Sequence, residues 1–464
     1  MRNPLDISNI EKEVDAPTLT IKHKKQKALE LSIKEGSASS FSSGLGTSYI
    51  SPFILAITPK EISGLLVGLL SAFSSLTSPI AQLFGSQLMI RHSRKKIVLL
   101  FVFLESIMWL SILFFAYLFM KGVFHNYLPI ALIVLYSILI AFSGASIPAW
   151  FSWMGDLVPE KDKGKYYGIR NTITGIIGLT AVLIGAFLLD SLKTRGFLLI
   201  GFMIIFALTF TFRFLGLIIL KKQFSPKFKL KKSSYFSLSD FIKRFDNFGK
   251  FATYQFFFYF ALMIASPFFT VYMLQDLNFS YTTFIIVSMS SSVFYLIFTP
   301  IIGKFSDRFG NLKLIYIGNI LFALTPIFWI FIKSPLLLIF IPQILSGLAN
   351  AAFIIGFTNF TYDSVSVQKR GIAIAYTDLF IGVGSFLGSL SGGFLIKYFP
   401  SSIVSPIIFI FILSGILRLL SGLIFLPQLK EWRRTEHLPP MKISLVHPFK
   451  SVHSEISWFR KVFR

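Results

Sequence analysis

The sequence predicts an all-α integral membrane protein with twelve transmembrane helices in two repeated six-helix bundles. Composition, a series of long apolar runs and an internal repeat support this fold class. The residues AVILMFWYC make up 54% of the 464 positions, charged residues make up 14%, and the mean hydropathy is +0.70. Soluble domains average about 45–50% apolar residues. A soluble enzyme, a disordered chain and a nucleic-acid-binding domain all fit this composition poorly.

Apolar runs bounded by charged or turn residues give the predicted membrane spans. A hydrocarbon core of about 30 Å requires about 20 apolar residues of helix. Twelve runs meet this need: 36–57, 62–89, 97–120, 128–155, 167–190, 197–220, 249–274, 281–302, 313–332, 335–358, 372–396 and 404–426. An even number of spans places both termini on the same side of the membrane.

Basic residues predict which side that is. Most of the 45 Lys and Arg residues lie in the tails and in the loops that follow even-numbered runs. Basic loops are retained in the cytoplasm. We therefore expect a multi-pass protein of the cell membrane with both termini cytoplasmic. The formal net charge of +24 then reflects topology and attraction to anionic lipids rather than binding to nucleic acid.

The longest internal loop divides the chain into halves. The predicted parts are a cytoplasmic tail (1–35), a six-helix bundle (36–220), a cytoplasmic linker (221–248), a second six-helix bundle (249–426) and a basic cytoplasmic tail (427–464). Within the linker, the spacing of apolar residues between 235 and 245 suits a short helix in the membrane interface. Residues 456–463 show a similar pattern, for which a solvated basic tail is an equal alternative.

The two halves repeat a set of residues in matching positions. The segments Asp156–Gly164 and Asp363–Gly371 follow the fourth and tenth runs, and both place Asp eight positions before Gly. Further matched pairs stand at corresponding places in the two halves: Asn171 with Asp378, Arg213 with Arg418, and Ser51-Pro52-Phe53 with Ser266-Pro267-Phe268. A repeated constellation of this kind indicates a duplicated six-helix bundle.

The loop between the eighth and ninth runs, Gly303-Lys-Phe-Ser-Asp307-Arg308-Phe-Gly310, resembles the signature loop of the major facilitator superfamily. With the twelve spans and the repeat, the resemblance covers nearly the whole chain. The first-half counterpart keeps Arg91 but has Ile90 where the family has Asp. The Gly-Pro motif typical of the fifth span in drug/proton antiporters is missing, which weakens an assignment as a multidrug exporter.

The resemblance implies a gate of charged residues at the cytoplasmic helix ends. The expected groups are Arg91 with Asp156, and Arg308 with Asp307 and Asp363. An ion pair at the membrane edge is stable but can be rehydrated, so it can act as a switch. A helix-end anchor at the lipid headgroups is the alternative.

Four ionisable residues lie inside the runs: Glu105, Arg213, Asp378 and Arg418. Charges in hydrocarbon are costly, so each should have a partner or face a water-filled cavity. We expect Asp378 to pair with Arg418, and Glu105 or Asn171 to pair with Arg213. Burial favours the neutral form of a carboxyl group, so such a residue can also carry a coupling proton. Glu105 is the preferred carrier because it has no repeat-related partner.

The resemblance implies a central cavity lined by the first, fourth, seventh and tenth spans. Polar and aromatic residues at helical spacing on these spans are the candidates to face it: Tyr49, Trp150, Trp153, Gln255, Tyr259, Gln343 and Asn350. Helix packing is the favoured reading for the Ser and Thr residues there. The cavity is predicted to be neutral and aromatic-rich, which favours a neutral or amphipathic organic solute.

The leading hypothesis is a secondary transporter that moves a small organic solute by alternating access, with proton coupling as an open option. A membrane solute-binding or sensor protein that does not transport is the alternative. A membrane enzyme is the weakest reading, since the six His residues show no ligand spacing and no metal or cofactor site is predicted. The expected partners are the solute, protons and membrane lipids, and the expected state is a monomer.

Overall fold

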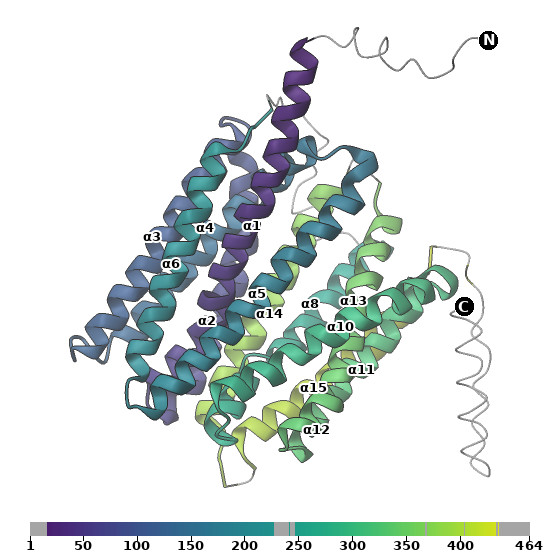
Figure 1. Cartoon of the computed structure of the whole chain (residues 1–464). Helices are drawn as coiled ribbons and strands as arrows, with labels where there is room; N and C mark the ends of the chain where they lie inside the picture. The colour runs from purple at the N-terminus through teal and green to yellow at the C-terminus, as the bar shows by residue number, and fades with distance from the viewer. Residues whose placement is uncertain are drawn as a thin grey trace, which may run out of the picture. The chain divides into compact units, whose positions relative to one another are not determined.

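The computed structural model describes residues 16–226, 241, 246–366, 369–402, 404–432 and 435. These residues form long α-helices joined by short turns (Figure 1). Among them, eleven helices are long and apolar enough to cross a membrane. The first predicted span lies in a 42-residue helix that is not one of the eleven. The all-helical membrane fold that the sequence predicts is confirmed.

The first repeat contains six long helices and one short turn of 3-10 helix. In chain order these are α1 (Ala16–Ile57), α2 (Lys60–Leu88), α3 (Arg94–Met120), α4 (Leu128–Leu157), η2 (Glu160–Asp162), α5 (Lys163–Thr194) and α6 (Leu198–Lys222). The helix α1 begins well before the predicted span at residue 36, so part of the predicted N-terminal tail is helical. Ser93 caps α3, because its hydroxyl accepts a hydrogen bond from the Lys96 amide at 3.4 Å.

The second repeat has the same order of spans, but two of them are broken. Its elements are α8 (Asn247–Met263), α9 (Phe268–Val271), η3 (Tyr272–Asp276), α10 (Tyr281–Phe309), α11 (Asn311–Phe331), α12 (Pro335–Phe340), α13 (Pro342–Ser364), α14 (Arg370–Tyr398), α15 (Pro406–Phe425) and η4 (Leu426–Gln428). The breaks lie between α8 and α9 and between α12 and α13. Pro267 and Pro342 stand at these breaks, and a proline cannot donate the backbone hydrogen bond that would continue a helix.

The described chain forms two compact units. One comprises the described residues within 1–50, 80–128 and 134–231, and the other comprises those within 51–79, 129–133 and 232–464. These units follow the predicted halves except that the end of α1 from residue 51, the first part of α2 and residues 129–133 belong to the second unit. In the first unit, side chains of α3, α4 and α6 such as Phe101, Trp153 and Leu217 share one buried core.

The core of the second unit is built mainly from phenylalanine. Phe251 and Phe258 of α8 pack with Phe353 and Phe360 of α13, and the Phe258 and Phe353 ring centroids are 4.5 Å apart. Of the apolar residues predicted to form an interfacial helix in the linker, only Phe241 is described, and it is buried in this same core. The other linker positions and the segment 456–463 lie outside the described residues.

Small residues allow α14 to approach α8 closely. Gly384, Gly388 and Gly392 recur every four residues on α14, and a Cβ atom added at any of them would collide with a backbone carbonyl of α8 or of Ile264, the residue that follows it. The three carbonyls belong to Phe256, Phe260 and Ile264. Close backbone approach at small residues is a common mode of helix packing in membranes.

Candidate solute pocket and buried charges

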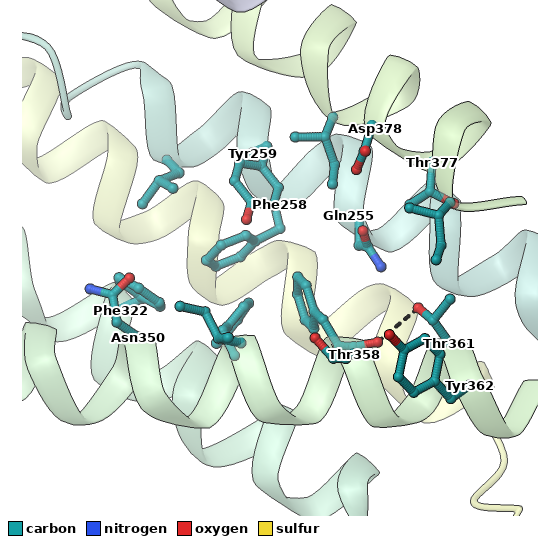
Figure 2. Close-up of a pocket in the computed structure, with 16 residues that line it drawn as sticks. Gln255, Phe258, Tyr259, Phe322, Asn350, Thr358, Thr361, Tyr362, Thr377 and Asp378 are labelled. Carbon is teal, nitrogen blue, oxygen red and sulfur yellow. Dashed lines mark hydrogen bonds between the residues drawn. The ribbon is translucent and has the colours of Figure 1, made fainter. Parts of the chain in front are cut away.

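The second unit encloses a pocket among α8, α11, α13 and α14, with a volume of about 460 Å³ (Figure 2). Small-molecule sites in proteins commonly span about 300–1,000 Å³. The lining is mostly apolar and aromatic, and consists of Gln255, Phe258, Tyr259, Leu262, Phe322, Asn350, Phe353, Ile354, Phe357, Thr358, Thr361, Tyr362, Ile374, Thr377, Asp378 and Ile381. The pocket therefore has the size and composition of a site for a small organic molecule.

Polar side chains enter this pocket from three helices, and Gln255, Tyr259, Asn350 and Asp378 are among them. Gln255 and Tyr259 stand four residues apart on α8 and so share one helix face. Asn350 comes from α13, where its amide nitrogen donates to the Ser346 carbonyl at 2.9 Å. Asp378 comes from α14, and Figure 2 shows its carboxylate pointing toward the same space as the Gln255 amide. Three of the seven predicted cavity residues are thus brought together here.

Asp378 does not pair with Arg418, contrary to the sequence-based expectation. Among the described residues Asp378 has no ion pair, whereas Arg418 is buried in α15 and donates to two backbone carbonyls. The acceptors are Phe322 at 2.8 Å and Leu262 at 3.2 Å. The two charges were expected to meet because they lie at similar depths. In the structure, Arg418 is held by the backbone of α8 and α11, while Asp378 lines the pocket.

Three other predicted cavity residues are buried in contacts between helices. The Tyr49 hydroxyl donates to the Val182 carbonyl on α5. The Trp153 indole donates to the Phe224 carbonyl at 3.0 Å, and the Gln343 amide donates to the Val287 carbonyl at 2.7 Å. These side chains are satisfied by neighbouring backbone, so their polarity serves packing in this structure.

Trp150, the remaining predicted cavity residue, forms a cation–π contact in the first unit. The Arg170 guanidinium carbon lies 4.7 Å from the Trp150 ring centroid. Arg170 also approaches Glu35 of α1, with 3.8 Å between a guanidinium nitrogen and a carboxylate oxygen. Trp150 is therefore in contact with a network of buried charges in the first unit.

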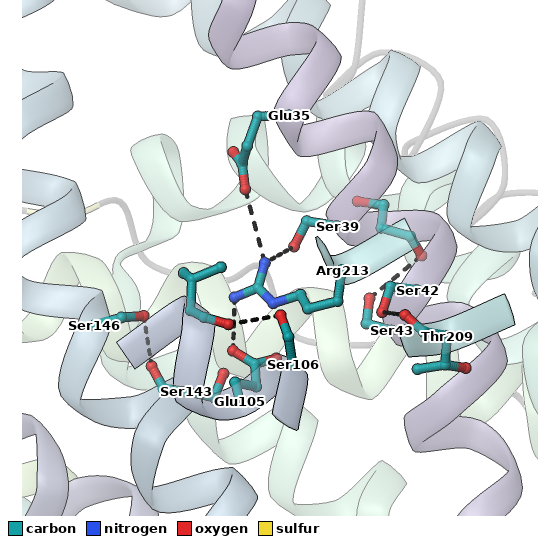
Figure 3. Close-up of polar contacts among 12 residues, drawn as sticks. Glu35, Ser39, Ser42, Ser43, Glu105, Ser106, Ser143, Ser146, Thr209 and Arg213 are labelled. Carbon is teal, nitrogen blue, oxygen red and sulfur yellow. Dashed lines mark hydrogen bonds and ion pairs between the residues drawn. The ribbon is translucent and has the colours of Figure 1, made fainter. Parts of the chain in front are cut away.

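The centre of that network is Arg213 on α6 (Figure 3). Its guanidinium lies 2.6 Å from a Glu105 carboxylate oxygen on α3 and 3.8 Å from a Glu35 carboxylate oxygen on α1. The Ser39 hydroxyl accepts a further hydrogen bond at 2.8 Å. Of the two partners expected for Arg213, the structure brings Glu105 into contact. Asn171 is not the partner.

Glu35 is a member of this network that sequence reasoning missed. It stands at the last position of the predicted cytoplasmic tail, outside the predicted spans. In the structure it is 4% exposed and lies in the middle of the long helix α1. The small residues that follow it, Gly36 to Ser40, are a signal that this stretch packs closely against neighbouring helices.

At the end of α4, the basic partner of Asp156 is Arg94 and not Arg91. Arg94 is the first residue of α3, and its guanidinium lies 2.7 Å from the Asp156 carboxylate and 2.7 Å from the Ser152 carbonyl. Arg91 is exposed in the turn that precedes α3. The predicted Arg91–Asp156 pair is therefore wrong, and the partner of Asp156 is the arginine three residues further along the chain.

The corresponding contact in the second repeat joins a neutral side chain, in place of an arginine, to an aspartate. Asn311 is the first residue of α11, and its amide donates to the Asp363 carboxylate at 3.0 Å. It also accepts a hydrogen bond from the Ser306 hydroxyl at 2.6 Å. Asp307 and Arg308, the other predicted gate residues, are exposed near the end of α10, with the Arg308 guanidinium 5.4 Å from the Phe309 ring centroid.

Two repeated sets of apolar helices, with a polar pocket and charges buried among them, define the general architecture of a multi-pass membrane transporter. Residues 36–245 and 251–456 match the family model described as "Major Facilitator Superfamily". The match covers most of the chain, and the chain therefore belongs to this superfamily of transporters.

Curated relatives match over a limited stretch. The chain is 34% identical over 100 residues to "Multidrug resistance protein 1" of Bacillus subtilis (strain 168), and 28% identical over 100 residues to "Multidrug resistance protein 2" of the same organism. Each alignment covers 22% of this chain and 25% of the relative. The matched stretch thus spans about a quarter of the length of these relatives.

Solved structures match over most of the chain. A mutant of nucleoside transporter NupG aligns with a TM-score of 0.66 at 14% identity, covering 86% of this chain and 100% of that one. A D-xylose-proton symporter aligns with a TM-score of 0.65 at 16% identity, covering 89% and 99%. At this level of identity the likeness concerns the fold.

Proposed function

We propose that this transporter moves a small organic solute by alternating access and that the pocket of the second unit is part of its solute site. The observation that carries the proposal is the pocket itself, where Gln255, Tyr259, Asn350 and Asp378 meet among apolar helices. Polar groups inside membrane helices mark substrate and ion pathways more often than lipid-facing surface. The distribution of Lys and Arg supports placement in the cell membrane with cytoplasmic termini.

Proton coupling through Asp378 is part of this proposal. A carboxylate that lines a pocket and has no ion-pair partner among the described residues can be neutralised by binding a proton. Glu105 is less suited to this task because it already has an ion-pair partner, the Arg213 guanidinium, at 2.6 Å. The sequence favoured Glu105 as the proton carrier and Asp378 as a member of an ion pair, and this proposal reverses the two roles.

Cytoplasmic gating is assigned to the contacts at the helix ends. The Arg94–Asp156 ion pair and the Asn311–Asp363 hydrogen bond each join the start of one helix to the end of another within one unit. We place Arg91, Asp307 and Arg308 beside these contacts as exposed groups of the same gate. Removal of either contact is expected to loosen the two helix ends that it joins.

Flux in proteoliposomes tests the proposal. Uptake and efflux of a panel of neutral, cationic and amphipathic solutes would be measured with and without an imposed pH gradient. We expect flux that follows the gradient in the wild type and in Glu61→Gln, which removes an exposed carboxylate from the same unit. Asp378→Asn should lose the response to the gradient. Gradient-driven flux that survives in Asp378→Asn would reject Asp378 as the coupling group.

A further inference from the structure

Asp378 is the only charged residue among the side chains that line the pocket. From this placement and from the rings around it, we infer that the pocket binds a monovalent organic cation with an apolar, aromatic-sized body. The inference rests on the proposed function and specifies the chemical class of its solute. Of the neutral or amphipathic solutes that the sequence alone suggested, it selects an amphipathic cation.

The charge balance of the pocket favours a cation. A carboxylate moved out of water needs a counter-charge or several hydrogen-bond donors, and Asp378 has no ion pair among the described residues. The nearest structural feature that could favour an anion is Arg418. Its side chain is 1% exposed and donates to the carbonyls of Leu262 and Phe322 behind the pocket wall. The Arg418 Nε atom has no hydrogen-bond partner but is buried, so Arg418 braces the wall and is shielded from a ligand in the pocket.

The aromatic lining supports the same class of ligand. Six of the sixteen lining residues carry six-membered rings: Phe258, Tyr259, Phe322, Phe353, Phe357 and Tyr362. Ring faces attract a nearby cation electrostatically, most strongly where water is excluded.

Contacts among these rings make the wall rigid. The Phe353 ring lies 4.5 Å from that of Phe258, 5.0 Å from that of Phe322 and 4.5 Å from that of Phe357, measured between centroids. Rings packed in this way lose little conformational freedom when a ligand arrives. A preorganised apolar wall opposite one carboxylate fits a bulky cation better than a hydrated inorganic ion.

Binding of two probes of the same shape and opposite charge tests the inference. Tetraphenylphosphonium and tetraphenylborate would be equilibrated by dialysis with the purified full chain in a nonionic detergent, at neutral pH. We expect saturable binding of tetraphenylphosphonium to the wild type and to Glu61→Gln. Asp378→Asn should weaken this binding at least tenfold, and Asp378→Glu should restore most of it. Tetraphenylborate should show no binding that depends on residue 378.

Several outcomes would overturn the inference. Equal affinity of the wild type and Asp378→Asn for tetraphenylphosphonium, with both proteins monodisperse and melting at similar temperatures, would remove the carboxylate from the site. Saturable tetraphenylborate binding in the pocket would assign the opposite charge to the ligand. The conservative variant Asp378→Glu keeps the test decisive if Asp378→Asn fails to fold.

Failure of this inference and failure of the proposed function give different results. Binding in detergent requires no transport, so binding that depends on Asp378 without flux of any solute in liposomes would support the pocket and reject the transport proposal. Flux of a neutral solute with no binding of tetraphenylphosphonium would keep the transporter and reject the cation.

Discussion

Two carboxylates inside the helices have opposite surroundings. Glu105 is 8% exposed and lies against the Arg213 guanidinium, while Asp378 lines a pocket and has no ion pair among the described residues. A buried pair is costly to break, whereas a lone carboxylate is a site that a proton or a cation can fill. These surroundings predict different results when each charge is removed.

Loss of Arg213 should strongly destabilise the protein. Arg213→Gln leaves Glu105 and Glu35 close to each other in a buried site without their counter-charge. Removing one partner of a buried ion pair costs about 3–5 kcal/mol in measured cases. A clear fall in the detergent melting temperature is expected. Lys222→Gln, at the exposed end of the same helix, is the matched control and should melt like the wild type. Equal melting of the two variants would contradict the buried network.

Removal of the Asp378 charge should leave stability almost unchanged. Asp378→Asn keeps the side-chain shape and breaks no ion pair among the described residues. The free energy of unfolding is therefore expected to change by no more than about 1 kcal/mol. Thermal unfolding of the purified variant measures this, beside Glu105→Gln as the comparison that should melt earlier. A large loss of stability in Asp378→Asn would indicate a structural partner and would weaken its proposed role in coupling.

Sequence reasoning located the charged residues but could not assign their contacts. Arg91 and Arg94 are one turn apart, and only the start of α3 at Arg94 decides which of them faces Asp156. Arg418 was assigned to Asp378 because both lie at similar depths, but contact depends on the direction in which each helix face points. Glu35 was missed because the helix around it begins twenty residues before the predicted span.

At the scale of elements, the apolar runs predicted the helices well and their interruptions poorly. The seventh and tenth runs read as continuous hydrophobic segments, yet each contains a break near Pro267 or Pro342. Other prolines, such as Pro300 in α10 and Pro326 in α11, stand inside helices that continue past them. Whether a proline ends a helix depends on the packing around it, which a single sequence does not contain.

The close contact of α14 with α8 leads to a prediction about helix packing. Gly388→Val should force the two helices apart, because even a Cβ atom at this position collides with the Phe260 carbonyl. Overpacking of this kind typically costs about 1–3 kcal/mol. Gly303→Ala is the control, since a Cβ atom there meets nothing within 4 Å. Gly388→Val should have a lower melting temperature than Gly303→Ala. A melting temperature of Gly388→Val equal to that of the wild type would show that α8 and α14 can move apart at little cost.

At the scale of the whole molecule, the boundary between the two compact units differs from the boundary between the two sequence repeats, and α2 shows the difference. It belongs to the first repeat by sequence, but its residues up to 79 are part of the second unit. There the Lys60 ammonium lies 3.2 Å from the Asp276 carboxylate, and the Ser63 hydroxyl donates to the Gln275 side chain at 2.9 Å. The internal repeat predicts two halves, but it cannot predict that helices of the first repeat contribute residues to both units.

This sharing makes α2 a place to test alternating access. Any motion of one unit relative to the other must change the contacts that α2 makes with at least one of them. Ser71 on α2 and Ser389 on α14 have hydroxyl oxygens 3.0 Å apart, and the chain contains no cysteine that would compete for a crosslink. A disulfide requires Cβ atoms about 3.5–4.5 Å apart, a range that such neighbours can reach with small shifts.

Ser71 and Ser389 both lie in the second unit, but they belong to different sequence repeats. Because alternating access in this proposal moves the repeats past each other, we expect the double variant Ser71→Cys, Ser389→Cys to lose solute flux when it is oxidised and to recover it when a reductant is added. The control is Ser280→Cys with Thr283→Cys, whose hydroxyls are also 3.0 Å apart but lie within one turn at the start of α10. Oxidation of the control should leave flux intact, because its crosslink joins no two helices. Full crosslinking of residues 71 and 389 with unchanged flux would show that α2 and α14 move together. The moving contact would then have to lie between α2 and the helices of its own repeat, where residues 80–88 join the first unit.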